Sequence, residues 1–122
     1  MQVLYAAWEA APFLKTGGLG DVAGALPAAL QAEACDIRVI LPKHGSIPAA
    51  LLKELKPVAD FYFDLSWRRQ YCGIEELIYH DVHYYFVDNQ YYFNRTAAYG
   101  YEDEAERTAY FSKAIVECLP YL

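Results

Sequence analysis

A glycine-rich segment that lies between an apolar run and a helical pattern constrains the fold of this chain most. Residues 3–8 are all apolar, which is typical of a strand covered on both faces of a parallel sheet. Glycines stand at positions 17, 18 and 20, and apolar residues then follow the spacing of an amphipathic helix, at Leu19, Val22, Ala23, Leu26 and Leu30. Residues 36–42 form a second strand of the buried type. The chain up to Pro42 therefore predicts a β-α-β unit.

The rest of the chain predicts a hairpin, one more strand and a closing helix. Two β-rich segments, 61–63 and 70–74, are expected to pair as a hairpin around 66–69, and 83–87 to return to the main sheet. Ser46 is expected to cap a short helix that ends at Lys53 or Leu55. Residues 88–101 are expected to form a loop or short helix, and 103–119 a helix that Pro120 stops. The predicted fold class is α/β, a Rossmann-like parallel sheet with an inserted β-hairpin.

Composition and charge limit the size and the partners of this fold. The chain has 122 residues, enough for one domain, and 56% of them are hydrophobic, which excludes a disordered chain. A net charge of −6 argues against a nucleic acid or an anionic membrane as the main partner. No stretch approaches the roughly 18 apolar residues of a membrane-spanning helix. The 3 cysteines form no CxxC pair, so no disulfide framework or zinc site is expected and the expected location is the cytoplasm.

The segment at 15–21, KTGGLGD, predicts an anion-binding loop. Its glycines leave backbone N–H groups uncovered at the positive end of a helix, and Lys15 adds a positive charge beside them. A glycine-rich turn needed only for tight chain reversal is the structural alternative. A Walker A loop is excluded, because the lysine precedes the glycines. Residues 18–23 match the dinucleotide pattern GxGxx[G/A], but they lie too far after the first strand and no acidic residue ends the second, which argues against NAD or FAD.

Three blocks of the sequence resemble the bacterial glycogen synthases and plant starch synthases. Residues 9–22 are EAAPFLKTGGLGDV and closely resemble the N-terminal signature of this family. The second block is RVILPK at 38–43, and the third joins 88–93 to 99–107. The chain departs from the family pattern at Trp8, where a serine is usual, and at 34–35, where Gly-His is common. The indole of Trp8 is expected either to narrow the site or to pack below it.

The resemblance implies a fold, an activity and a domain. Members of this family are GT-B glycosyltransferases, in which two Rossmann-like domains face a cleft. The implied reaction moves glucose from ADP-glucose to the non-reducing end of an α-1,4-glucan, with retention of configuration and without a metal or cofactor. Residues 1–122 would then be the N-terminal portion of the catalytic domain, with the C-terminal domain absent. A complete enzyme needs on the order of 450 residues, so the isolated chain is expected to be inactive and to hold no catalytic residue.

Carried over by motif, the substrate-binding residues are Lys15, Gly17, Gly18, Asp21 and Tyr99. Lys15 would contact the diphosphate of ADP-glucose, and the bare amides of Gly17 and Gly18 would hold the diphosphate or the donor glucose. Asp21 would line the cleft and bond sugar hydroxyls, or complement the helix dipole. Tyr99 would stack against an acceptor sugar, since an aromatic face suits the C–H face of glucose.

Other polar residues are expected to have structural roles. Arg107 should pair with Asp103, which lies four residues earlier on the predicted helix. His80 and His83 should point to opposite faces of a strand, which argues against a shared metal ion. His44 is placed on the rim of the cleft, because it follows the second strand.

Two other functions remain open from the sequence. One is a stand-alone α/β domain that binds a glucan or a sugar nucleotide without turning it over. The other is a UDP-glucose or sucrose transferase of the same architecture, because in this family the nucleobase is bound outside the segment that this chain represents. The sheet edge and the last helix would lack neighbours, so the fragment is expected to dimerise or aggregate.

Overall fold

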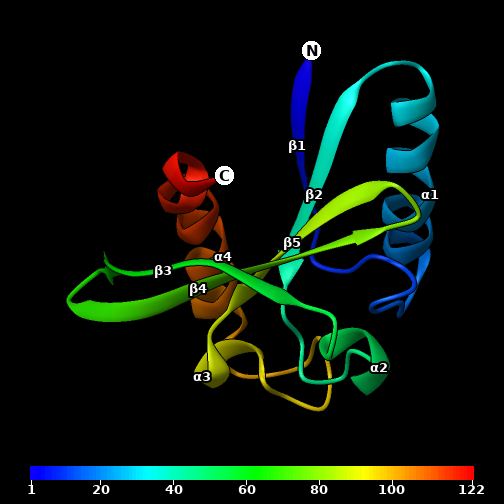
Figure 1. Cartoon of the computed structure of the whole chain (residues 1–122). Coiled ribbons are helices and arrows are strands. Elements are labelled where there is room, and N and C mark those ends of the chain that lie inside the picture. The colour runs from blue at the N-terminus through cyan, green and yellow to red at the C-terminus, as the bar shows by residue number, and fades with distance from the viewer.

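The predicted β-α-β unit forms the parallel part of the sheet in the computed structural model, which describes residues 1–122 (Figure 1). It consists of β1 (Gln2–Ala6), α1 (Gly18–Ala32) and β2 (Asp36–Pro42). β1 pairs in parallel with β2, and β2 pairs in parallel with β5 (Val82–Asp88) on its other side. The strand order is β1-β2-β5-β4-β3, so β1 stands at one edge with its outer side unpaired. The Rossmann-like part of the predicted fold is confirmed.

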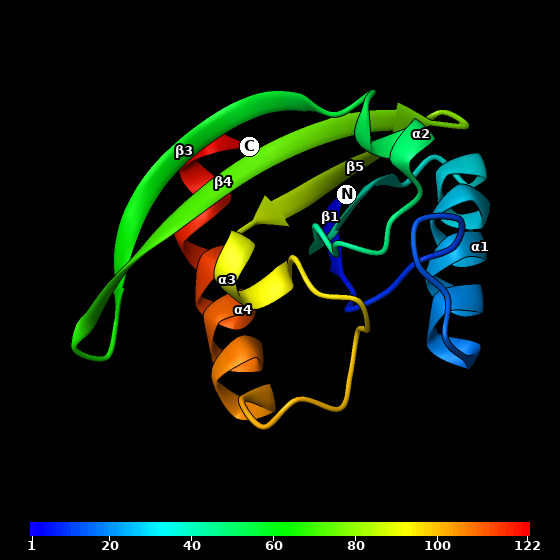
Figure 2. The ribbon, with the colours of Figure 1, turned by 90° about the horizontal axis from the view of Figure 1, so that it is seen from below.

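A long hairpin extends the opposite edge of the sheet. β3 (Lys56–Leu65) and β4 (Arg68–Tyr79) are antiparallel, and β4 also pairs in antiparallel with β5, so the sheet as a whole is mixed. Ser66 takes the left-handed conformation at the turn, with φ 57°. Both strands are longer than predicted, because exposed charged residues such as Asp60 and Asp64 interrupt the apolar pattern. The tip of the hairpin projects beyond the helices (Figure 2).

Helices cover both faces of the sheet (Figure 1). α4 (Glu104–Cys118) and the single turn α3 (Gln90–Phe93) pack over one core cluster, and α1 packs over the other. Ile40 of β2 belongs to the first cluster and Val39 to the second, so β2 is buried on both sides. A 3-10 turn, η1 (Leu119–Tyr121), follows α4. None of the helices has the length and apolar character that a membrane crossing requires.

α2 (Ala49–Leu52) is shorter than predicted, and Ser46 does not cap it. Pro48 directly precedes the first helical residue, whereas Ser46 lies in the turn before it. A residue that precedes proline is disfavoured in the helical conformation, so Ile47 does not join the helix. The helix therefore begins after the proline.

α1 packs through small residues rather than through the apolar residues of its periodic pattern. Its buried residues are Gly20, Ala23 and Pro27. Leu19 and Val22 are 45% and 53% exposed, although the pattern predicts them in the core. The loop before the helix lies so close that a Cβ at Gly20 would come within 2.8 Å of a side-chain oxygen. Only small residues fit that face, and the larger apolar side chains form an exposed stripe on the other; self-association of the chain remains a prediction.

Candidate functional site

The loop at residues 7–17 joins the carboxyl end of β1 to the first turn of α1. Parallel α/β sheets bind ligands at this end of their strands. Lys15 extends from the loop, and its Nζ lies 3.0 Å from Oδ1 of Asp21 in the first helical turn. The two side chains are 54% and 59% exposed, so the ammonium group stands in solvent beside the helix N-terminus. There the ammonium group can release the carboxylate of Asp21 and pair with an incoming anion instead.

Glu9 is the buried charge that organises this loop. The residue is 1% exposed, and its carboxylate accepts five hydrogen bonds. Oε1 accepts the backbone N–H groups of Thr16, Gly17 and Gly20 at 3.1, 3.2 and 2.9 Å. Oε2 accepts the hydroxyl groups of Thr16 and Tyr99, the latter at 2.9 Å. One carboxylate therefore holds the start of the loop, its end, the first turn of α1 and a segment far along the chain.

The protonation states of Glu9 and Tyr99 suit this arrangement. Burial raises the pKa of Glu9, but the hydrogen bonds from Thr16, Tyr99 and Gly17 outweigh it and hold the pKa below its ordinary value of 4.5. Glu9 is therefore ionised near neutral pH. Burial and the Glu9 carboxylate raise the pKa of Tyr99 to about 12, so its hydroxyl keeps the proton that it donates.

Gly17 and Gly18 leave open space on the outer side of the loop. A Cβ added at either position would meet no heavy atom within 4 Å. Gly17 is extended, with φ −169°, and Gly18 opens the helix, where glycine is less favourable than alanine. The packing of the chain therefore requires glycine at neither position. A ligand that approaches the backbone from outside would require it, because a side chain there would block the approach. Of the two amides predicted to be bare, that of Gly17 donates to Glu9, and that of Gly18 has no intrahelical partner.

Tyr99 contacts the loop at residues 7–17, the glycine loop, through Glu9, which lies 90 residues earlier in the sequence. Its hydroxyl is held by Glu9, and the residue is 44% exposed, which leaves ring surface available to a ligand. A tyrosine fixed in this way is suited to packing against the C–H face of a sugar. The structure thus brings all the predicted binding residues to one loop, and their roles in binding remain predictions.

Trp8 packs below the loop instead of narrowing the site. Its indole N–H donates to the carbonyl of Ala98 at 3.0 Å. Its ring makes edge-to-face contacts with His44, Phe93 and Phe111, with centroid distances of 5.6, 5.8 and 5.6 Å. This departure from the family pattern therefore adds to the core beneath the site.

His44 is buried, and its predicted position on the rim of the cleft is wrong. It is 1% exposed, and its Nε2 donates to the carbonyl of Trp8 at 2.6 Å, which leaves Nδ1 without a partner. The cause is the path of the chain after β2. The N–H of Gly45 donates to the carbonyl of Phe93 at 2.9 Å, which draws this segment under α3.

We expect His44 to make the protein less stable in mild acid. Burial lowers the pKa of His44 from its ordinary value of 6.5. The positive charge of Arg107 adds to this effect, and the hydrogen bond to the Trp8 carbonyl opposes it. Below pH 6.5 the imidazole of His44 is protonated in the unfolded chain but still neutral in the folded chain. The contribution of His44 to the free energy of unfolding is therefore intact above this pH and is lost as the pH falls toward the pKa of the folded state. Urea unfolding at pH 7.5 and pH 5.0 should show a smaller acid loss for His44→Gln than for wild type or for the exposed-site control His80→Gln. Equal losses in all three proteins would contradict this assignment.

Arg107 pairs with Glu104 and not with Asp103 as predicted. Its Nη1 lies 2.8 Å from Oε1 of Glu104, whereas Asp103 pairs with Arg95 at 2.6 Å. Asp103 is the N-cap residue, so its side chain turns away from the helix toward the preceding loop. Arg107 is fully buried and its Nε donates to the carbonyl of Tyr92 at 2.9 Å. Arg107 thereby fastens α3 to α4, and a second bond from its Nη1, to the carbonyl of Ala98, fastens the segment between them.

The histidines and cysteines form no metal-binding cluster. No group of three or more His, Cys, Asp and Glu side chains is placed to hold a metal ion. His83 pairs with Glu76 at 2.8 Å, and His80 stacks on Tyr79 with ring centroids 4.1 Å apart. All three cysteines are free thiols.

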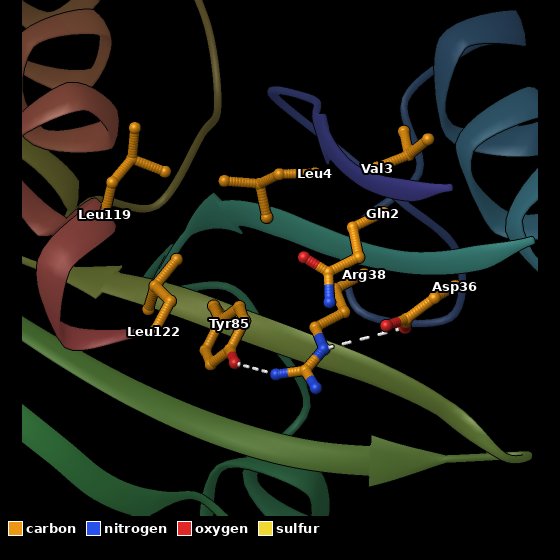
Figure 3. A pocket seen from close by; sticks show the side chains of 8 residues that line it. All are labelled: Gln2, Val3, Leu4, Asp36, Arg38, Tyr85, Leu119 and Leu122. Carbon is orange, nitrogen blue, oxygen red and sulfur yellow. Dashed lines mark hydrogen bonds and ion pairs between the residues drawn. The ribbon is translucent and has the colours of Figure 1, made fainter.

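A separate pocket lies at the other end of the parallel strands (Figure 3). It is lined by the first residues of β1 and β2, by Tyr85 and by the last residues of the chain, Leu119 and Leu122. Arg38 spans it, donating to the hydroxyl of Tyr85 at 2.6 Å. The pocket lies away from the carboxyl ends of the strands, so it is not part of the site around the glycine loop.

Sequence reasoning assigned no role to Glu9. The available signal is local, a single carboxylate between an apolar strand and a glycine-rich segment. The sequence does not show which groups satisfy that carboxylate, because Tyr99 approaches it only when α3 and α4 have packed on the sheet.

Comparisons with known proteins find relatives over the whole length of the chain. Residues 2–122 match the family model described as the starch synthase catalytic domain. The glycogen synthases of Desulfitobacterium hafniense and Anoxybacillus flavithermus are 53% and 50% identical to the chain over 122 residues. These matches cover 100% of this chain but only 26% and 25% of the two relatives, so the chain spans about a quarter of their length.

A solved structure has the same fold over most of the chain. It is the catalytic domain of Starch Synthase IV from Arabidopsis thaliana bound to ADP and acarbose. Its TM-score is 0.79 at 28% sequence identity, and the match covers 96% of this chain and 24% of that one.

Proposed function

The chain belongs to the starch synthase catalytic domain family, and we propose that residues 1–122 are the N-terminal portion of the catalytic domain of a glycogen synthase. The full-length protein would be a GT-B glycosyltransferase whose C-terminal domain lies outside this chain. The sheet supports this division. The order β5-β2-β1 corresponds to one half of a Rossmann sheet, and the unpaired side of β1 is the edge at which the second half begins in that topology.

The proposed activity is transfer of glucose from ADP-glucose to the non-reducing end of an α-1,4-glucan, with retention of configuration. The observation that carries it is the open outer side of Gly17 and Gly18 beside Lys15, at the carboxyl end of β1. A departing diphosphate gains negative charge in the transition state, and an ammonium group and a free amide stabilise that charge. The Arabidopsis structure is bound to ADP, which supports an adenosine diphosphate as the leaving group, and the partly exposed Tyr99 would meet the acceptor glucan.

The isolated chain is expected to be inactive. About three quarters of the length of its relatives lies outside it, and we place there the pocket for the base and the carboxylate near the reacting carbon. The free thiols suit a cytoplasmic protein. The exposed stripe of α1 and the unpaired side of β1 favour self-association of the isolated chain.

Gly18→Ala tests the proposed site, because it should separate stability from binding. The new Cβ meets nothing in the chain, so the free energy of unfolding should stay the same or rise by up to about 1 kcal/mol. The same Cβ would occupy the space through which the diphosphate approaches the backbone, so ADP should bind at least about tenfold more weakly, roughly 1.4 kcal/mol. Urea unfolding and calorimetric titration with ADP, both on the full-length protein, measure the two effects. Wild-type affinity for ADP in the variant would argue against this loop as the donor site.

A further inference from the structure

We propose that Glu9 is a positioning residue for the donor substrate: its buried carboxylate fixes the glycine loop so that Lys15 and the amide of Gly18 face the diphosphate. This inference rests on the proposed function. Glu9 is 1% exposed and its oxygens point into the loop, so it acts through its neighbours rather than on the sugar nucleotide.

The hydrogen bonds of Glu9 determine which groups remain available to a ligand. Backbone N–H groups at the start of a helix are the usual partners of a bound anion. Here those of Thr16, Gly17 and Gly20 all donate to Oε1 of Glu9. An anion from solvent is left with the amides of Gly18 and Leu19 and with the ammonium group of Lys15. The internal carboxylate therefore restricts the donor to the outer side of the loop.

The second oxygen of Glu9 connects the donor loop to another segment. Oε2 accepts the hydroxyl of Thr16 from the loop and the hydroxyl of Tyr99 from the segment between α3 and α4. The position of Tyr99 is thus tied to the conformation of the loop. Loss of the carboxylate would release both elements together.

Glutamine can replace these contacts without the charge. Its amide oxygen can accept the three N–H groups, and its amide nitrogen can donate to the hydroxyls of Thr16 and Tyr99, which are able to accept. The negative charge itself repels a diphosphate, so it is not what the donor needs. A positioning role therefore predicts that Glu9→Gln preserves donor binding and that Glu9→Ala does not.

The test measures KM for ADP-glucose, KM for glucan and kcat in the full-length protein. Glu9→Ala should raise the KM for ADP-glucose at least about 30-fold, because the loop is no longer held in the binding geometry. Glu9→Gln should stay within about threefold of wild type. Glu33→Ala is the matched control, since Glu33 is an exposed acidic residue at the other end of α1, and it should leave all three constants unchanged.

Thr16→Val keeps the test decisive if Glu9→Ala does not fold. It removes one hydroxyl bond to Oε2 while keeping the backbone N–H and the side-chain shape, and it should raise the KM for ADP-glucose roughly fivefold. The inference is overturned by an unchanged donor KM in a folded Glu9→Ala or in Thr16→Val, or by a Glu9→Gln as defective as Glu9→Ala. A wild-type protein that neither binds ADP nor transfers glucose would instead contradict the proposed function itself.

Discussion

Lys15→Ala in the full-length protein is expected to lower kcat/KM for ADP-glucose about 100-fold, the usual cost of removing one group that stabilises developing negative charge. The Lys15 ammonium is the cation beside the open side of the glycine loop, and its only ion pair is with an exposed aspartate at 3.0 Å. Stability should hardly change, because an exposed pair of this kind contributes about 0–1 kcal/mol. Steady-state kinetics with ADP-glucose and with UDP-glucose would measure the effect.

Two variants separate this role from a general effect of charge. Lys53→Ala removes an exposed lysine next to α2 and should leave the kinetics unchanged. Asp21→Asn keeps the shape of the partner of Lys15 and shows whether Asp21 bonds the sugar or only holds the lysine. A Lys15→Ala protein with wild-type kcat/KM would remove Lys15 from the site, and faster transfer from UDP-glucose would favour the related UDP-glucose or sucrose enzymes over the proposed donor.

The elements that could be predicted from the sequence are those whose pattern is local. The strand at 36–42 has the predicted bounds, because most of its residues are apolar and are buried on both faces of the sheet. The helix begins at Gly18, within the glycine-rich segment that precedes the predicted helical pattern, since the glycines and the periodic residues adjoin. Lys15 and Asp21 could be placed beside its N-terminus for the same reason.

The features that could not be predicted depend on contacts between distant segments. α1 turns Ala23 rather than Val22 to the core, because the preceding loop approaches it too closely for larger residues. His44 is buried because α3 folds over it. The role of Glu9 depends on Tyr99, which lies far along the chain and donates to its carboxylate. In each case a local pattern suggests an orientation, and the packing of another element decides it.

The site is built on an aromatic and cationic layer that no single motif encodes. Trp8 ends the apolar run before the loop, and the guanidinium of Arg107 lies 5.2 Å from its ring centroid. Both side chains donate to the carbonyl of Ala98, at 3.0 and 3.1 Å. Ala98 precedes Tyr99, so the position of the proposed acceptor-side tyrosine depends on this pair as well as on Glu9.

Arg107→Ala is therefore expected to destabilise the protein by about 3–5 kcal/mol, the usual cost of truncating a large buried side chain to alanine. The residue is fully buried and donates to two backbone carbonyls and to Glu104, so truncation removes three hydrogen bonds, leaves the carbonyl of Tyr92 without its donor and opens a cavity. Arg68→Ala is the matched control, since Arg68 is 43% exposed and pairs with Glu106 at 3.6 Å, and it should cost less than about 1 kcal/mol. Urea unfolding at pH 7.5 compares the two. Equal losses of unfolding free energy in the two variants would mean that Arg107 does not hold the segment that carries Tyr99. Removing a side chain that fastens two backbone carbonyls to the core must cost more than removing an exposed ion pair.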